Sequence, residues 1–242
     1  MSDGTGTWLR PGERGISEEL RTFVQEFPLE RASILDFVAR VASSTPPGAR
    51  VLDLGAGDAP YRELFAHADY RTTDWAESPH TAARRADVIA DASSLPLEQG
   101  SFDLVLSTQV LEHLPEPAAA LRECFRILRP GGRLALTAPL AWEPHELPHD
   151  YYRYTAPGLE HLLTVAGFGE VTIAPRTDSF TTLAQLLSNV GASLGRSPDG
   201  LDHARRQAQT LLDDLAGELA RLSALDVTWT LPLGYCASAV RP

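Results

Sequence analysis

The chain has 242 residues and a formal net charge of -11, with 21 Lys and Arg against 32 Asp and Glu. This length fits one α/β domain with some additional helical chain, and it leaves no room for a second catalytic domain. The acidic balance, with no basic run in the sequence, argues against nucleic acid and anionic membranes as partners.

Cysteine usage and the first residues indicate the cellular setting. Cys124 and Cys236 are far apart and lack the paired spacing of a disulfide framework or a zinc motif. The N-terminus has no basic start followed by an apolar core, and no apolar run reaches the roughly 18 residues that span a bilayer. We therefore expect a cytoplasmic protein with reduced cysteines.

The first part of the chain is predicted to be helical. Residues 16–27 and 28–42 carry apolar side chains at helical spacing, and Pro46, Pro47 and Gly48 follow the second helix. We expect residues 1–45 to form an N-terminal cap on a core of residues 46–242. Trp8 in this cap is a candidate for contact with a substrate.

A buried strand over residues 50–54 is predicted to run into a glycine turn at Gly55 and Gly57, with Asp53 just before it. A dinucleotide-binding turn brings backbone N–H groups onto a pyrophosphate, which a carboxylate at the strand end would repel. A cationic ligand is favoured instead. The glycines would let the backbone lie against an adenosyl group, and Asp53 would compensate the positive amino acid portion of S-adenosylmethionine.

After a helix over residues 60–66, the strand at 70–74 ends in Asp74 and the apolar run at 87–91 ends in Asp91. The carboxyl ends of parallel strands meet at one edge of a sheet, where such sheets bind ligands. Asp74 could accept hydrogen bonds from both ribose hydroxyls, and Asp91 from an adenine amino group. Each could instead be a loop or capping carboxylate.

Trp75 and Ala92, the neighbours of these two carboxylates, complete the predicted cofactor contacts. Trp75 could stack on adenine or pack within the protein.

The order of these features, more than any one of them, indicates a family. Residues 51–139 resemble the core of a class I S-adenosylmethionine-dependent methyltransferase, with Phe102–His113 similar to its fourth strand and following loop, and Leu128–Pro139 similar to its fifth strand. His149–Thr155 and Ala166–Phe168 resemble a small-molecule-modifying branch, the methyltransferase type 11-like one. The resemblance implies that S-adenosylmethionine is the cofactor.

The resemblance also places the loop after the fourth strand beside the transferring methyl group. It implies that Gln109 contacts the amino acid end of the cofactor through its backbone carbonyl. His113 could deprotonate an acceptor, since an imidazole has a pKa near ~6.5. A His that caps backbone carbonyls before Pro115 is the alternative.

Residues 143–154 are predicted to form a loop that is rich in reactive side chains. Pro144 and Pro148 disfavour a helix, so His145 and His149 would not share one helical face as in a zinc site, and we predict no metal site. The alternative is that the loop histidines and two carboxylates still converge on an ion. Either histidine could serve as a base.

The same loop carries three candidates for contact with the acceptor. Tyr151, Tyr152 and Arg153 could hold an aromatic or anionic acceptor. Alternatively, Tyr152 and Arg153 merely tie the loop to the next helix, which Thr155 is predicted to cap.

Helical patterns fill most of the remaining chain. A helix from Pro117 is predicted to end at Pro130 and Gly131, with Cys124 in the core. Residues 177–226 form a helical insertion between the last two strands, at 170–175 and 233–240. Its apolar stripes, from Leu183 and from Leu211, could pair within the chain or across a homodimer.

The predicted fold is therefore α/β: a Rossmann-like, doubly wound, seven-stranded sheet whose last strand the resemblance makes antiparallel. The predicted function is methylation of a small metabolite, with O-methylation favoured over N- or C-methylation. A non-catalytic regulatory homologue that binds S-adenosylmethionine is one alternative. An NAD-dependent oxidoreductase is another, although Asp53 and Pro60 conflict with it.

Overall fold

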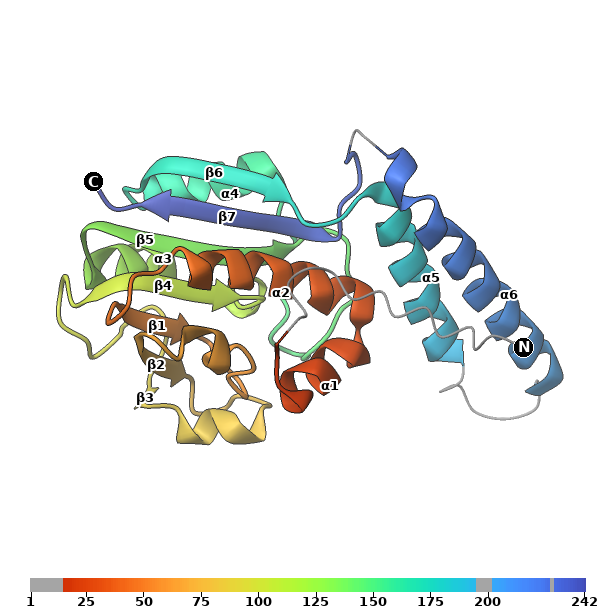
Figure 1. The fold of residues 1–242 in the computed structure, drawn as a ribbon, viewed down its shortest axis with the longest axis horizontal. Coiled ribbons are helices and arrows are strands. Elements are labelled where there is room, and N and C mark those ends of the chain that lie inside the picture. Colours follow the sequence, from red (N-terminus) through yellow and green to blue (C-terminus); the bar gives the residue numbers. More distant parts are fainter. Residues whose placement is uncertain (1–14, 195–201, 227–228) are drawn as a thin grey trace.

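The computed structural model describes residues 15–194, 202–226 and 229–242, so Trp8 lies outside the described residues. These residues form a seven-stranded sheet with helices on both faces, and a helical hairpin extends from one end of it (Figure 1). The predicted α/β fold class is confirmed.

The sheet has the strand order β3-β2-β1-β4-β5-β7-β6, and β7 runs antiparallel to both of its neighbours, as predicted. The first five strands pair in parallel. The strands are β1 (Arg50–Leu54), β2 (Asp69–Asp74), β3 (Val88–Ile89), β4 (Phe102–Thr108), β5 (Leu128–Pro139), β6 (Gly169–Pro175) and β7 (Gly234–Val240).

The helices are α1 (Glu18–Glu26), α2 (Pro28–Ser43), α3 (Pro117–Ile127), α4 (Ala156–Val165), α5 (Ser179–Leu194) and α6 (Asp202–Arg221). The predicted cap of α4 is confirmed, because the Thr155 side chain accepts a hydrogen bond from the Gly158 N–H. No helix in the described part of the chain is both long and apolar enough to cross a membrane.

Strand periodicity divides the core into one layer on each face of the sheet. Val51 faces a layer that contains α1 and α2, whereas its neighbour Leu52 faces a layer that contains α3 and α4. On β4, Leu104 and Leu106 likewise alternate with Val105. In Figure 1, α2 crosses one face while α3 and α4 cover the other. Cys124 is buried in the second layer, as predicted.

Three predicted boundaries are wrong. The helix expected over residues 60–66 is only a single 3-10 turn, Arg62–Phe65. Helix α3 ends at Ile127, where β5 begins, because Leu128 pairs with Phe102 of β4. Strand β3 ends at Ile89, so Asp91 follows the strand and does not close it.

The insertion forms a hairpin in which α5 and α6 pack on each other within one chain. The approach is close, since a Cβ on Gly191 would lie 2.6 Å from Nε2 of Gln209. The buried side of α5 is largely polar or small, and the predicted apolar stripes stay mainly outside: Leu183, Val190, Leu211, Leu215 and Leu222 are exposed. The periodicity therefore identified the helices but not their packing faces.

A buried ion pair joins α2 to the end of β6. The Arg176 guanidinium donates to Glu30 Oε1 at 2.7 Å and to Ser33 Oγ at 2.9 Å. The side chains of Arg176 and Glu30 are 0% and 9% exposed. The hairpin begins just beyond Arg176, so this pair anchors its base to the core.

Replacing Arg176 with Met would leave Glu30 buried without its partner, a change that typically costs about 3–5 kcal/mol. We expect the free energy of unfolding, measured by urea denaturation, to fall by about that amount. Arg221→Met is the matched control, because the pair of Arg221 with Glu218 is 61% and 67% exposed and should contribute no more than about 1 kcal/mol. Equal losses in the two variants would contradict this assignment.

Candidate active site

The glycine turn after β1 has the backbone conformation that only glycine adopts easily. Gly55 has a φ of +69° and Gly57 a φ of +54°. A Cβ on Gly55 would lie 2.5 Å from Cγ2 of Val110, in the loop after β4. The turn is therefore packed directly against that loop.

Asp74 connects the glycine turn to the end of β2. Its Oδ2 accepts a hydrogen bond from the Gly57 N–H at 2.7 Å, and its Oδ1 accepts one from the Trp75 N–H at 2.8 Å. A carboxylate oxygen has a second lone pair, so both oxygens can still accept from a ligand hydroxyl. Asp74 is 6% exposed, and its role at the ribose of an adenosyl cofactor stays a prediction.

Asp53 lies inside the sheet edge and not on its surface. It is 2% exposed, and the Tyr70 hydroxyl donates a hydrogen bond to its Oδ2. Burial raises the pKa of the Asp53 carboxyl to about 7. Its predicted role opposite a cationic amino acid stays a prediction, and such a cation would favour the ionised form.

The remaining cofactor candidates lie in different surroundings. Asp91 is exposed, and its Oδ1 accepts from the backbone N–H and hydroxyl of Ser93, which lowers the pKa of the Asp91 carboxyl. Ala92 packs into the core, so only its backbone could face a ligand. The Trp75 ring meets the His149 ring edge to face, with centroids 4.9 Å apart.

Gln109 adopts a left-handed conformation just after β4, with a φ of 53°. Such backbone is disfavoured for a residue other than glycine and often marks a functional site. Its Nε2 donates to Thr137 Oγ1 at 2.9 Å, and its N–H donates to the Thr137 carbonyl at 3.2 Å. Thr137, on β5, was not predicted from the sequence, where it is an ordinary strand residue.

The loop after β5, residues 140–155, docks on the loop after β4. The Glu112 carbonyl accepts from the N–H groups of Tyr151 and Tyr152, at 2.9 and 3.3 Å. The Tyr152 hydroxyl donates to the Pro115 carbonyl at 3.0 Å. Tyr152 therefore ties the two loops together, whereas Tyr151 is 45% exposed and remains available for a ligand.

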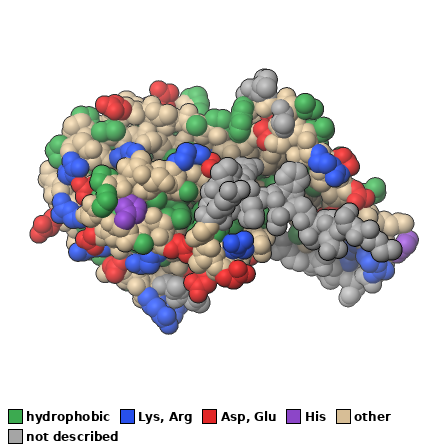
Figure 2. All heavy atoms as spheres, in the orientation of Figure 1, with side chains coloured by type: hydrophobic (Ala, Val, Ile, Leu, Met, Phe, Trp, Pro, Cys, Tyr) green, Lys and Arg blue, Asp and Glu red, His purple; other side chains and the backbone are tan. Residues whose placement is uncertain are grey.

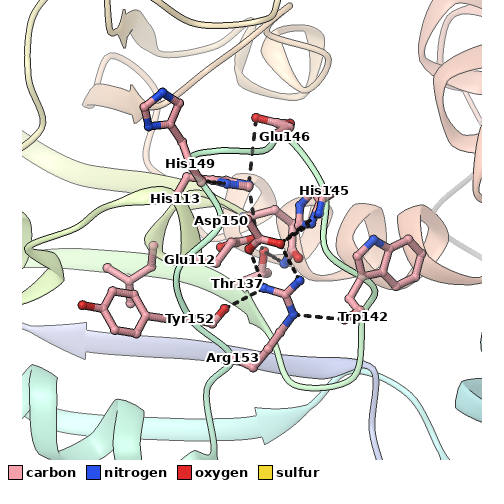
Figure 3. Close-up of polar contacts among 12 residues, drawn as sticks. Glu112, His113, Thr137, Trp142, His145, Glu146, His149, Asp150, Tyr152 and Arg153 are labelled. Atoms are coloured by element: carbon pink, nitrogen blue, oxygen red, sulfur yellow. Dashed lines mark hydrogen bonds and ion pairs between the residues drawn. The ribbon is translucent and has the colours of Figure 1, made fainter.

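Arg153 holds the docked loop in shape. A guanidinium has five N–H groups, and those of Arg153 donate to Asp150 through both oxygens and to the carbonyls of Trp142, Glu143 and Tyr152 (Figure 3). The same contacts hold the pKa of the Asp150 carboxyl down at about 2. The expectation that Arg153 holds the acceptor is wrong, because all its donors are used within the loop.

Two of the three predicted histidines lie together. The His113 and His145 rings are 4.7 Å apart between centroids, whereas the His149 side chain points away from them (Figure 3). What His149 contributes is its carbonyl oxygen, 2.6 Å from Nδ1 of His113. Because a carbonyl only accepts, Nδ1 of His113 carries the proton and Nε2 has a free lone pair.

Burial lowers the pKa of the His113 imidazole, so this ring is neutral at neutral pH. Two acidic side chains approach it: Glu112 Oε1 lies 3.9 Å and Glu146 Oε2 4.0 Å from its Nε2. Glu146 also lies 3.4 Å from His80, and this contact lowers the pKa of the Glu146 carboxyl.

Glu112 was not singled out from the sequence. It is 0% exposed, and burial raises the pKa of its carboxyl to about 8. Its position beside His113 after a predicted strand was the available signal, but the pattern gave no sign that the side chain turns inward.

The site therefore combines two kinds of chemistry at one edge of the sheet. The glycine turn and Asp74 are the candidate place for a nucleoside, and His113 and His145 on the docked loops are the candidate contacts for a second molecule.

Comparison with known proteins shows which family the central segment of the chain matches. Residues 52–136 match the family described as "Methyltransferase domain". A ubiquinone biosynthesis O-methyltransferase of Pseudomonas aeruginosa is 34% identical over 102 residues, which cover 37% of this chain and 44% of that protein. A malonyl-[acyl-carrier protein] O-methyltransferase of Methylococcus capsulatus is 32% identical over 171 residues, 62% of each chain. The chain thus spans about half the length of the curated relatives it matches.

Solved structures of the same fold agree. An S-adenosylmethionine-dependent methyltransferase of Archaeoglobus fulgidus superimposes with a TM-score of 0.56 at 18% identity, covering 91% of this chain and 98% of that one. The [4+2]-cyclase SpnF gives a TM-score of 0.57 at 22% identity, covering 88% and 82%. These structures show that the chain has the fold of class I S-adenosylmethionine-dependent methyltransferases, and residues 52–136 match the methyltransferase-domain family.

Proposed function

We propose that this protein transfers a methyl group from S-adenosylmethionine to a small molecule. The observation that carries the proposal is the bond between the Gly57 N–H and Asp74, which fixes a glycine turn beside a carboxylate able to accept ribose hydroxyls. The match of residues 52–136 to a methyltransferase domain supports it.

When bound, the cofactor supplies an electrophilic methyl group: its C–S bond breaks with the electron pair going to sulfur, while a bond from the acceptor to that carbon forms. The protein's part is alignment of the acceptor and removal of its proton. The neutral His113, with a free lone pair at Nε2, and the adjacent His145 are the groups that act on the acceptor.

An oxygen acceptor is the substrate class that we favour. An acceptor hydroxyl loses a proton during transfer, and the site holds neutral imidazole to assist that loss. Relatives over the matched segment are named as O-methyltransferases, which supports the same choice. The exposed ring of Tyr151 could lie against an aromatic acceptor.

The flanking segments are proposed to complete the pocket. Phe27, between α1 and α2, meets Trp142 of the docked loop edge to face, with ring centroids 5.9 Å apart. This contact supports a role of residues 15–45 as a cap over the docked loop. Trp8, which lies outside the described residues, and the insertion at 177–226 are proposed to complete the cap as a lid. A homodimer through the exposed apolar stripes of the hairpin is a further proposal.

The surface charges bear on the class of acceptor, and the cysteines bear on the redox environment of the protein. On the described part of the face in Figure 2, acidic and basic side chains are interspersed, which suits a small acceptor better than nucleic acid. Cys124 and Cys236 are free and buried, which supports a reducing, cytoplasmic setting.

Calorimetry tests the cofactor assignment. We expect S-adenosylmethionine to bind with micromolar affinity and NAD to give no heat of binding, because Asp53 at the end of β1 disfavours a pyrophosphate. A coupled assay for S-adenosylhomocysteine release over a panel of hydroxylated metabolites then tests turnover. Binding of NAD without binding of S-adenosylmethionine would overturn the proposal.

Asp53→Asn tests the buried carboxylate. The Asp53 pKa of about 7 in the folded chain exceeds the ordinary Asp value of 3.8, so folding takes up a proton between these pH values. The carboxylate therefore makes the folded state less stable as pH rises from about 4 to 7. We expect the Asn variant to gain stability relative to the parent between pH 5 and 8, while its affinity for S-adenosylmethionine falls about tenfold.

Asp103→Asn is the control for this pH dependence. Contact with Arg129 and the Arg50 N–H lowers the pKa of Asp103 in spite of its partial burial, so it stays ionised from pH 5 to 8. The effect of Asp103→Asn on the free energy of unfolding should therefore be constant from pH 5 to 8. A constant effect for Asp53→Asn as well would show that Asp53 is not a buried acid of raised pKa.

Measurements of kcat distinguish the roles of the three histidines. We expect His113→Ala and His145→Ala to lower kcat by about 10²-fold or more, with the dissociation constant of S-adenosylmethionine changed less than about threefold. His149→Ala is the matched control, and its kcat should stay within about threefold because its ring points away from the pair. Equal losses in all three variants would contradict the assignment of the acceptor to His113 and His145.

A further inference from the structure

Glu112 is a fully buried acid. Its side chain is 0% exposed, and neither carboxylate oxygen has a hydrogen-bond partner among the described residues. Buried carboxylates are nearly always hydrogen-bonded, paired with a cation or bound to a metal, because an isolated one is costly. A cation at the Glu112 oxygens would supply the partner that the described residues do not.

Two histidines stand where that cation would bind. Glu112, His113 and His145 each offer one ligand atom, and these atoms all lie within 4.8 Å of one another. Nε2 of His113 is 3.9 Å from Oε1 of Glu112. Metal–ligand bonds of about 2.0–2.2 Å to nitrogen and oxygen span separations of this size with small side-chain movements.

The outer contacts of both histidines are those of metal ligands. Metal-binding histidines usually donate their second ring N–H to a carbonyl or carboxylate, which fixes the ring and leaves the other nitrogen free. Nδ1 of His113 meets the His149 carbonyl at 2.6 Å. Nδ1 of His145 meets the Glu143 carbonyl at 3.2 Å and Oδ2 of Asp150 at 3.4 Å.

We propose that Glu112, His113 and His145 bind one divalent transition metal ion. Two imidazoles and one carboxylate suit Zn²⁺, Mn²⁺, Fe²⁺ or Co²⁺ better than Mg²⁺ or Ca²⁺, which prefer oxygen ligands. Glu146, whose Oε2 lies 4.0 Å from Nε2 of His113, is placed to add a fourth ligand.

If the proposed methyl transfer is correct, the ion held by these residues would bind and activate the acceptor. This role rests on the proposed function. Three protein ligands leave coordination positions open for an acceptor oxygen, whose hydroxyl pKa the ion would lower. The acceptor proton then passes to solvent. In the metal-loaded protein, the lone pair of His113 binds the ion, so His113 acts on the acceptor through the ion and not as a free base.

The test is metal binding by the full chain, produced without a histidine tag and stripped of metal by a chelator. We expect titration with Co²⁺, followed by visible absorption and calorimetry, to show one ion per chain with micromolar affinity. Glu112→Gln, His113→Ala and His145→Ala should each weaken binding by about 100-fold or more. His149→Ala, a change of the same type in the same loop, should leave the dissociation constant unchanged.

Two readouts keep this proposal separate from the proposed function. The parent and all variants are first shown to be folded by circular dichroism, and their affinity for S-adenosylmethionine is measured without metal. A protein that binds S-adenosylmethionine but not Co²⁺, Zn²⁺ or Mn²⁺ would overturn the metal site alone. Stoichiometric Co²⁺ binding that survives all three ligand substitutions would also overturn it, whereas metal binding without S-adenosylmethionine binding would overturn the proposed function instead.

Discussion

The docking of residues 140–155 on the loop after β4 is the constraint on which the acceptor side of the site depends. The Glu112 carbonyl receives two backbone N–H groups from the docked loop, and the His149 carbonyl faces His113 in return. Arg153 keeps the docked loop in shape with donors to one carboxylate and three carbonyls. These contacts bring His113 and His145, from different loops, to within 4.7 Å between ring centroids.

The two halves of the site rest on different physical effects. On the cofactor side, backbone conformation and packing determine the shape of the site. Gly55 leaves no space for a side chain against Val110, and the Gly57 N–H is hydrogen-bonded to Asp74. On the acceptor side, burial decides. It raises the pKa of Glu112 and lowers that of His113, so both groups favour their neutral forms until a cation or an acceptor arrives.

The sequence predicted the order of elements and the glycine turn after β1 well, because these depend on local patterns. Apolar strands with a glycine turn and acidic strand ends gave β1, β2 and the positions of Gly55, Gly57 and Asp74. It failed where long-range packing decides. The sequence spacing of His145 and His149 did not reveal that His145 contacts His113, which lies in another loop. No sequence pattern showed that the Glu112 side chain faces inward, or that the apolar stripes of α5 and α6 stay exposed.

A crystal structure of the full chain with S-adenosylhomocysteine tests the central claim, that the glycine turn and Asp74 form a nucleoside site beside the docked loops. We predict the ribose hydroxyls within hydrogen-bond distance of Asp74 and the thioether sulfur on the side of His113 and His145. A nucleoside bound elsewhere, or a glycine turn without the nucleoside at saturating concentration, would contradict it.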